Sequence, residues 1–472
     1  MVQFEERLFI AGQFVEGSGE KIDVINPATK EKIASVHAAG AKEVDLAVDA
    51  AEKAWPAWAD GDPSVRTKAL FKLSELIEAN GEELKLAQTM EMGKSITESG
   101  YDIAASAGMF RYFAGYADKI SGKTSAMPGF LGMEIRQPYG VTAGITPWNA
   151  PLVMVTMKVG PALAAGNASI IKTSEKSPLA ALIVARLAKE AGVPDGILSI
   201  LSGGRETGQI IASHMKIRKI SFTGSTLAGK SVAQAAARSN LKACTLELGG
   251  KSPVVVFDDC DLEDAVAKIQ LGFNVTSGQV CIANTRIYVQ DTIFDKFGQK
   301  LVESLEKMQV GDPLDGSSFS GPLVDDIQFK NVSKYLDIGK KEGKVLIGGV
   351  TGDEKGYFVK PTIFVDVNDD AVINREEIFG PVTILHKFTS EDEVLKRAND
   401  TEYGLSAYVF TKDVTRAIKF AKRMEAGVVG VNVTLMANNN LAFGGWKGSG
   451  LGRELGQHGV ESYTQVKTIF MR

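Results

Sequence analysis

The sequence predicts an α/β protein with two doubly wound, Rossmann-like parallel sheets and a small additional β element. Short apolar strands alternate with helices from Val141 to about Gly250, and a second alternating section runs from Pro253 to about Gly459. Strand–helix alternation with short connections that contain Gly and Pro is typical of parallel sheets. A chain of 472 residues also exceeds the size of one hydrophobic core, so we expect two or three domains.

The expected elements follow the chain in a simple order. Residues 1–40 indicate short strands and turns, and residues 41–121 have apolar side chains at helical spacing. Pro63 after Asp62 indicates a helix start. In the first alternating section we expect strands at 141–146, 168–172, 197–201, 219–223 and 244–248, and helices at 151–165, 178–191, 207–214 and 228–239. The tail at 462–471 alternates like an edge strand, which must pair with another strand or with a second subunit.

Composition and charge narrow the class of protein. A net charge of −4 gives no reason to expect nucleic acid or an anionic membrane as partner, and no apolar run reaches the roughly 20 residues of a membrane span. Cys244, Cys260 and Cys281 form no disulfide framework, which fits a reducing compartment. The four histidines have no zinc spacing, and Met1 to Arg7 lack a signal pattern. We therefore expect a cytoplasmic enzyme without a metal.

Cys281 and Glu247 form a candidate nucleophile and general base. Cys281 ends Ser277-Gly-Gln-Val-Cys and has no second cysteine within metal-ligand range. Glu247 is a single carboxylate in an apolar strand that runs into a diglycine, and burial there raises the pKa of a carboxyl group toward that of a useful base. Taken alone, a lone cysteine is most often a small buried hydrophobe, and a strand glutamate is usually half-exposed surface.

Asn149 lies in a turn bracketed by two prolines, Pro147-Trp-Asn-Ala-Pro151. A side-chain amide fixed at the end of a strand can donate to a developing oxyanion. The structural alternative is that Asn149 caps the following helix.

Nucleotide-binding signals are individually weak. No G-x-G-x-x-G follows the first strand of the alternating section. Ser225, in a turn between strand and helix, could meet a phosphate, or it could simply cap the helix. Gly204 ends another Gly-rich strand, and Glu175, three residues after Lys172, could bind ribose hydroxyls. The alternative for Lys172 and Glu175 is a solvated charged turn.

Eight stretches, in order, resemble the aldehyde dehydrogenase superfamily over nearly the whole chain. They are Pro147-Trp-Asn149, Lys172-Thr-Ser-Glu175, Phe222-Thr-Gly-Ser225, Leu246-Glu-Leu-Gly-Gly-Lys251, Gly278-Gln-Val-Cys281, Glu376-Glu-Ile-Phe-Gly-Pro381, Asn432 and Phe443-Gly-Gly-Trp-Lys-Gly-Ser-Gly-Leu-Gly-Arg-Glu454. Each stretch is weak singly, but their shared order is specific.

The resemblance implies NAD(P)-dependent oxidation of an aldehyde to a carboxylic acid. Cys281 is expected to form a thiohemiacetal and then a thioester, Asn149 to hold the oxyanion, and Glu247 to activate the hydrolytic water. The implied cofactor contacts are Ile145, Trp148, Lys172, Glu175, Gly204, Ser225, Gly249, Glu377 and Phe379. Glu175 favours NAD over NADP because a 2′-phosphate adds negative charge beside it, although Lys172 leaves NADP possible.

The expected substrate is an apolar aldehyde, aromatic or medium-chain aliphatic. The tunnel positions implied by the resemblance are Ala150, Val153, Met154, Met157, Val280, Ile282, Met436 and Phe443. They include no carboxylate to attract an amino aldehyde and no arginine to clamp a carboxylate. Ala150 stands where the family often has a bulky aromatic residue, and Ala442 where it usually has proline. The alternatives are an amino- or semialdehyde dehydrogenase of the same mechanism, an acylating enzyme that uses coenzyme A, and a non-catalytic structural or binding relative.

The resemblance also implies a domain division. A cofactor domain is expected at 1–120 and 137–250, a catalytic domain at 251–460, and an oligomerisation β element at 121–136 and 461–472. A homodimer or a dimer of dimers is the family norm.

Overall fold

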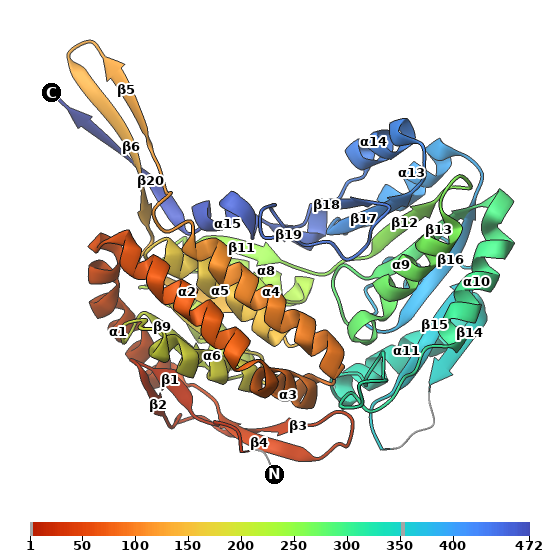
Figure 1. Cartoon of the computed structure of the whole chain (residues 1–472), viewed down its shortest axis with the longest axis horizontal. Coiled ribbons are helices and arrows are strands. Elements are labelled where there is room, and N and C mark those ends of the chain that lie inside the picture. The colour runs from red at the N-terminus through yellow and green to blue at the C-terminus, as the bar shows by residue number, and fades with distance from the viewer. Residues whose placement is uncertain (1–2, 351–354) are drawn as a thin grey trace.

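The computed structural model describes residues 3–350 and 355–472, so Met1 and Val2 of the N-terminal segment lie outside it. It confirms the predicted fold class. Within the described residues an eight-stranded sheet occupies one half of the molecule and a seven-stranded sheet the other, and a three-stranded sheet projects from the first half (Figure 1).

The first sheet has a parallel centre with antiparallel edges. Its strand order is β19-β11-β10-β7-β8-β9-β1-β2. The strands are β1 (Leu8–Ile10), β2 (Gln13–Val15), β7 (Val141–Ile145), β8 (Ala168–Lys172), β9 (Leu198–Leu201), β10 (Lys219–Thr223), β11 (Ala243–Glu247) and β19 (Gly450–Leu451). The helices of this half are α1 (Ala41–Asp60), α2 (Pro63–Ala79), α3 (Gly81–Met92), α4 (Ile96–Ala114), α5 (Pro151–Ala164), α6 (Leu179–Glu190), α7 (Arg205–Ser213) and α8 (Thr226–Arg238). A separate hairpin pairs β3 (Lys21–Ile25) with β4 (Lys32–His37).

The predicted strands of this section are confirmed to within one residue at each end. Asp62 caps α2 by accepting a hydrogen bond from the Ser64 N–H, as the Asp-Pro pair predicts. Helices α7 and α8 each begin two residues earlier than expected, because Gly204 and Ser225 are their N-cap residues.

The second sheet has the order β14-β15-β16-β13-β12-β17-β18, and all of its neighbours are parallel except β14 and β15. Its strands are β12 (Ser252–Val256), β13 (Asn284–Gln290), β14 (Lys344–Val350), β15 (Val359–Val365), β16 (Val382–Phe388), β17 (Ser406–Phe410) and β18 (Val428–Val431). The helices are α9 (Leu262–Asn274), α10 (Phe294–Glu306), α11 (Asp326–Glu342), α12 (Val372–Arg375), α13 (Glu391–Asn399) and α14 (Val414–Arg423), with 3-10 turns η1 (Val275–Gly278), η2 (Asp291–Ile293) and η3 (Lys447–Ser449). Helix α15 (Gly456–Glu461) returns to the first half, where it contacts α5 (Figure 1).

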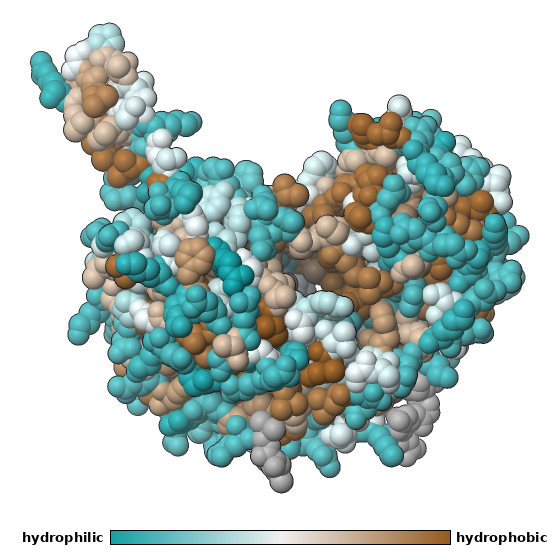
Figure 2. Space-filling view, viewed as in Figure 1, coloured by the Kyte–Doolittle hydropathy of each residue, from teal (hydrophilic) through white to brown (hydrophobic). Residues whose placement is uncertain are grey.

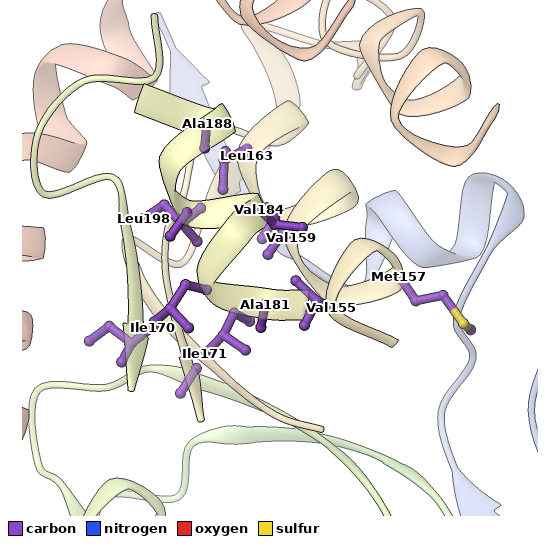
Figure 3. Packing of buried hydrophobic residues seen from close by; sticks show 14 of the residues in the cluster. Val155, Met157, Val159, Leu163, Ile170, Ile171, Ala181, Val184, Ala188 and Leu198 are labelled. Atoms are coloured by element: carbon purple, nitrogen blue, oxygen red, sulfur yellow. The ribbon is translucent and has the colours of Figure 1, made fainter. Parts of the chain in front are cut away.

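Helices α5 and α6 pack on the first sheet through a dry layer of aliphatic side chains. Ile171 of β8, Val155 and Val159 of α5 and Val184 of α6 are fully buried there, whereas Met157 leaves α5 on a different side (Figure 3). Because close-packed interiors deform little, this layer fixes where the parallel strands end.

The projecting sheet, here called the arm, has the order β20-β6-β5. It consists of β5 (Lys123–Met127), β6 (Phe130–Pro138) and β20 (Thr464–Met471), so the tail is an edge strand that pairs with β6. Phe130, Val466 and Phe470 are exposed by 50%, 55% and 65%, and hydrophobic residues are visible on the arm in Figure 2. Across residues 3–350 and 355–472, no helix combines the length and hydropathy needed to cross a bilayer.

Candidate active site

The carboxyl ends of the parallel strands in the first sheet bring the predicted motifs to one edge. Ile145 lies beside Lys172 and Phe222, and Thr223 lies beside Glu247. The segments that follow these strands carry Asn149, Ser225 and Gly249. This edge is where open α/β sheets bind ligands.

A cavity of about 210 Å³ lies at this edge, where segments of the second half close over it. Its walls unite predicted residues from six segments of the chain, namely Trp148, Asn149, Met154, Ser225, Gly249, Cys281, Glu377 and Phe379. They also contain residues that sequence reasoning missed, namely Pro147, Thr223, Gly224, Leu248 and Gln328. A larger cavity of about 1090 Å³, beside Met308 and Phe358, contains none of the predicted residues.

Other predicted residues do not line this cavity. They are Glu247, Ile145, Lys172, Glu175 and Gly204, and the tunnel positions Ala150, Val153, Met157, Val280, Ile282, Met436 and Phe443. Ile145, Met157, Ile282 and Phe443 are buried in the core of the first half, whereas Met436 is 44% exposed. The structure therefore places Met154, but not the rest of the predicted tunnel, on the cavity wall.

Cys281 is a partly exposed thiol on the cavity wall rather than a fully buried hydrophobe. Burial, and to a smaller extent the nearby carboxylates of Glu377 and Glu247, raise the pKa of its thiol to about 12. The thiol is consequently protonated at neutral pH in this arrangement. Nucleophilic attack requires a group that takes its proton.

Asn149 is buried, and its Nδ2 donates a hydrogen bond of 2.8 Å to the carbonyl oxygen of Gln279. It does not cap the next helix, because Ala150 is the N-cap residue of α5 and no side chain caps it. A side-chain amide carries two N–H donors. The bond to Gln279 therefore fixes the amide plane and leaves a second N–H for the cavity that Asn149 lines.

Glu247 is buried, as its apolar neighbours predicted. Neither carboxylate oxygen has a hydrogen-bond partner among the described residues. Burial raises its pKa well above 4.5, and the charge of Glu454 adds to the increase. Glu454 is itself paired with the buried Lys158 at 2.9 Å, and Lys158 also donates to Thr223 at 2.8 Å. An unpaired buried carboxyl group is costly, and such groups concentrate at functional sites.

Glu377 approaches the first sheet over two glycines. Its Oε1 accepts a 2.9 Å hydrogen bond from the Gly250 N–H. A Cβ on Gly249 would lie 2.3 Å from Glu377 Oε2, and a Cβ on Gly250 would lie 2.3 Å from the carbonyl oxygen of Cys281. Burial raises the pKa of Glu377 to about 7. The diglycine is therefore required by close approach of the second half.

Phe379 is held in a left-handed conformation, with φ of 58°. Its carbonyl oxygen accepts a 2.7 Å hydrogen bond from Gln328 Nε2, and its ring meets the Trp148 ring edge to face at 5.3 Å between centroids. Gln328 lies in α11 and belongs to none of the quoted motifs, so no local sequence signal marks it.

The predicted adenosine-side residues lie next to the same edge. Lys172 is buried, which lowers its pKa, and its Nζ is 3.7 Å from Glu175 Oε2. This pair is not a fully solvated turn. Ser225 is the N-cap residue of α8, as the structural alternative predicted, and its Oγ accepts from the Ala228 N–H at 3.3 Å. The cap leaves other N–H groups of this helix end facing outward, an arrangement suited to anions.

Comparison with known proteins shows to which family this chain belongs. The model of the "Aldehyde dehydrogenase family" matches residues 14–469. The chain belongs to the aldehyde dehydrogenase family. It is therefore an oxidoreductase that acts on aldehydes, in a family that uses NAD or NADP.

Several relatives are similar over their full length. An aldehyde dehydrogenase of Emericella nidulans is 45% identical over 100% of this chain and 96% of its own. Among solved structures, the γ-glutamyl-γ-aminobutyraldehyde dehydrogenase of Burkholderia cenocepacia has a TM-score of 0.98 at 40% identity, covering 100% of this chain and 97% of that one. The indole-3-acetaldehyde dehydrogenase of P. syringae, a mutant in complex with NAD+ and IAA, has a TM-score of 0.98 at 37% identity with the same coverage.

The close approach at Gly250 generates a test of the site geometry. We expect Gly250→Ala to displace the Cys281 backbone and to change the rate of Cys281 alkylation by iodoacetamide severalfold or more, because that rate depends on the exposure and ionisation of the thiol. The measurement is the modification rate of the Cys281 peptide by mass spectrometry. Gly316→Ala is the matched control, because a Cβ there meets nothing within 4 Å; equal rates in both variants would contradict the geometry.

Proposed function

We propose that this protein oxidises an apolar aldehyde to its carboxylic acid, with Cys281 as the nucleophile. One observation carries the proposal, namely that a single cavity brings together the Cys281 thiol, the oriented amide of Asn149 and the side chains of Glu377 and Phe379. These groups come from distant parts of the sequence, and each has a defined chemical task in aldehyde oxidation.

The reaction begins with formation of a bond between Cys281 Sγ and the aldehyde carbon, while the thiol proton passes to a solvent water molecule. The carbonyl electrons move to oxygen, and the Asn149 amide and the Cys281 N–H stabilise the resulting oxyanion by about 3 kcal/mol per donor. Loss of hydride from the carbon then leaves a thioester on Cys281. Water attacks this thioester, the sulfur–carbon bond breaks, and the acid and the free thiol are released.

The residues at the strand ends fit a dinucleotide. The outward N–H groups at the start of α8, beside Ser225, suit a pyrophosphate. Lys172 and Glu175 are placed for the adenosine ribose, and Glu377, whose carboxylate reaches over Gly249, for the nicotinamide ribose. Gly204 and Ile145 would contribute to the cleft, and Trp148 and Phe379 supply its aromatic wall. When bound, NAD accepts the hydride.

Glu247 supports water as the acyl acceptor. Its raised pKa makes the deprotonated carboxylate a stronger base than that of an ordinary glutamate. Interception of the thioester by coenzyme A requires no such base, and a non-catalytic relative requires neither this carboxylate nor the thiol. Both alternatives are therefore less well supported than hydrolysis.

The apolar substrate is supported by the cavity wall. Pro147, Met154 and Leu248 supply apolar surface, and the acidic side chain on that wall is Glu377, which we assign to the cofactor. An aminoaldehyde is the second candidate, because the similar structure from Burkholderia cenocepacia is named for one. The similar enzyme from P. syringae is named for an aromatic aldehyde.

The mechanism predicts different defects for two variants. Cys281→Ala should abolish aldehyde-dependent NADH formation because no covalent intermediate can form. Glu247→Gln should lower kcat by roughly 10²–10⁴-fold and accumulate an acyl-enzyme, visible as a mass increase on Cys281. Full turnover by Cys281→Ala would exclude the covalent mechanism, and dominant acyl-CoA formation on adding coenzyme A would exclude hydrolysis.

The same base predicts a pH dependence. Only the deprotonated Glu247 can accept a proton from water, and burial raises its pKa well above 4.5. As pH falls, hydrolysis should therefore fail at a pH above that of an ordinary glutamate. We expect the acidic limb of acyl-enzyme hydrolysis, measured in a single turnover, to have its midpoint above pH 4.5 and to be absent in Glu247→Gln. A midpoint at or below 4.5 would contradict the buried-base assignment.

A substrate panel tests specificity. We expect aromatic and medium-chain aliphatic aldehydes to exceed amino- and semialdehydes in kcat/KM by roughly tenfold or more. NAD should exceed NADP because a 2′-phosphate would lie beside the Glu175 carboxylate, with Lys172 reducing the difference. Preference for an aminoaldehyde would favour the second candidate.

We further propose a cytoplasmic homodimer or dimer of dimers assembled through the arm, with the cofactor and catalytic domains divided near Lys251. The exposed apolar side chains on the arm and the open edge of β20 support an interface there. Val466→Glu combined with Phe470→Glu should lower the mass measured by light scattering, whereas Val414→Glu, an exposed site on α14, should not. An unchanged mass in the double variant would place the interface elsewhere.

A further inference from the structure

The turn that leads to Cys281 has an unusual backbone. Thr276 has φ and ψ of 52° and 33°, Ser277 has 56° and 38°, and Gly278 has φ of 71°. Three consecutive residues are thus left-handed, and two of them carry a Cβ that disfavours this conformation. Strain of this kind persists only where the surroundings hold it in place.

Glu98 of α4, in the other half of the molecule, binds this turn. Its Oε1 accepts a hydrogen bond of 2.7 Å from the Thr276 N–H. Its Oε2 accepts from the Ser95 N–H at 3.3 Å, and the Ser95 hydroxyl in turn accepts from the Glu98 N–H. The Glu98 carboxylate therefore caps its own helix and also binds the left-handed turn at residues 276–278.

Residues at and just before the start of α4 pack closely against segments that contact the turn at residues 276–278. The Ile96 N–H donates to the carbonyl oxygen of Pro313 at 2.8 Å. A Cβ on Gly321 would lie 1.9 Å from the carbonyl oxygen of Gly93. Ser277 Oγ donates to the Gly321 carbonyl oxygen at 2.7 Å. Motion of the first turn of α4 is consequently transmitted to residues 276–278.

The turn positions both Cys281, the proposed nucleophile, and Asn149, the proposed oxyanion donor. Gln279 follows it directly, with its Nε2 donating to the Thr276 carbonyl oxygen at 3.0 Å. The Gln279 carbonyl oxygen accepts from Asn149 Nδ2, and Cys281 lies two residues further along the chain. A change in the turn therefore alters the thiol and the oxyanion donor together.

We propose that Glu98 is a positioning residue that holds the left-handed turn at 276–278 and thereby aims Cys281 and Asn149. This inference rests on the proposed role of Cys281 as nucleophile. Burial raises the pKa of Glu98 to about 7, with Lys94 opposing the increase and Asp102 adding to it. By contrast, Glu43 fills the same capping position in α1, binds Gly40 and Ser18, and has a lowered pKa. Glu43 is also buried but binds no residue of the turn at 276–278, so it is a capping glutamate that lacks the contact proposed for Glu98.

The test compares Glu98→Ala, Glu98→Gln and Glu98→Asp with Glu43→Ala. Aspartate keeps the charge but is one carbon shorter, and glutamine keeps an acceptor oxygen at full length. We expect Glu98→Ala and Glu98→Asp to lower kcat roughly tenfold or more with little change in the KM for NAD. They should also change the rate of iodoacetamide modification of the Cys281 peptide severalfold or more, because that rate follows the exposure and ionisation of the thiol. Glu98→Gln should recover most of the modification rate. Glu43→Ala should lower the Tm but leave that rate within about twofold of the unaltered protein.

A second-site variant separates positioning from general destabilisation. Glycine adopts left-handed φ without steric cost, so Thr276→Gly should restore part of the modification rate when added to Glu98→Ala or, if that variant does not fold, to Glu98→Asp. An unchanged rate in the single Glu98 variants, an equal loss in Glu43→Ala, or no gain from Thr276→Gly would overturn the proposal. Thiol modification needs no turnover, so these outcomes are distinct from failure of the proposed function, which Cys281→Ala reports.

Discussion

The passage of the chain from one sheet to the other through Gly249 and Gly250 is the constraint on which the site depends. Side chains there would collide with the Glu377 carboxylate and with the Cys281 carbonyl, each at 2.3 Å. The bare backbone lets two segments of the second half reach the strand ends of the first. Cofactor-side and thiol-side groups can share one small cavity because this crossing occupies so little space.

The close approach of these segments also determines the pKa values of the ionisable groups at the site. Cys281, Glu247 and Glu377 all have raised pKa values, with burial as the largest cause, and each carboxylate raises the pKa of the thiol. Ionisation of either carboxylate therefore makes ionisation of the thiol harder. The raised pKa keeps the Cys281 thiol protonated at neutral pH in this arrangement. Such a thiol is protected from indiscriminate oxidation, which attacks thiolates.

Local signals predicted the first sheet well. Its parallel strands are short apolar runs bounded by Gly, Pro and charged residues, so their bounds agree to within one residue, whereas α7 and α8 begin two residues before their predicted starts. Asn149, Cys281, Glu377 and Phe379 were predicted through quoted motifs, and the structure places all four on one cavity. Their chemical roles and the full substrate path stay predictions.

Other features depend on contacts between distant segments. Gln328 reaches the Phe379 carbonyl from the first turn of α11, and Glu98 binds a turn 178 residues away in the sequence. Thr276 and Ser277 are ordinary residues whose identity does not indicate a left-handed backbone. Neither hydrophobic periodicity nor turn chemistry contains this information, because tertiary packing imposes it.

The pairing of β19 with β11 has a consequence for biosynthesis. Gly450 pairs with Glu247 and Leu451 with Leu246, so the strand that carries the proposed base acquires its outer neighbour only after most of the second sheet has been made. At typical translation rates, the roughly 200 intervening residues take about 10 to 40 s to emerge. Throughout that interval the nascent chain exposes an open strand edge, a state that favours intermolecular pairing. This connectivity therefore requires either that a chaperone binds the nascent chain or that the second half folds rapidly.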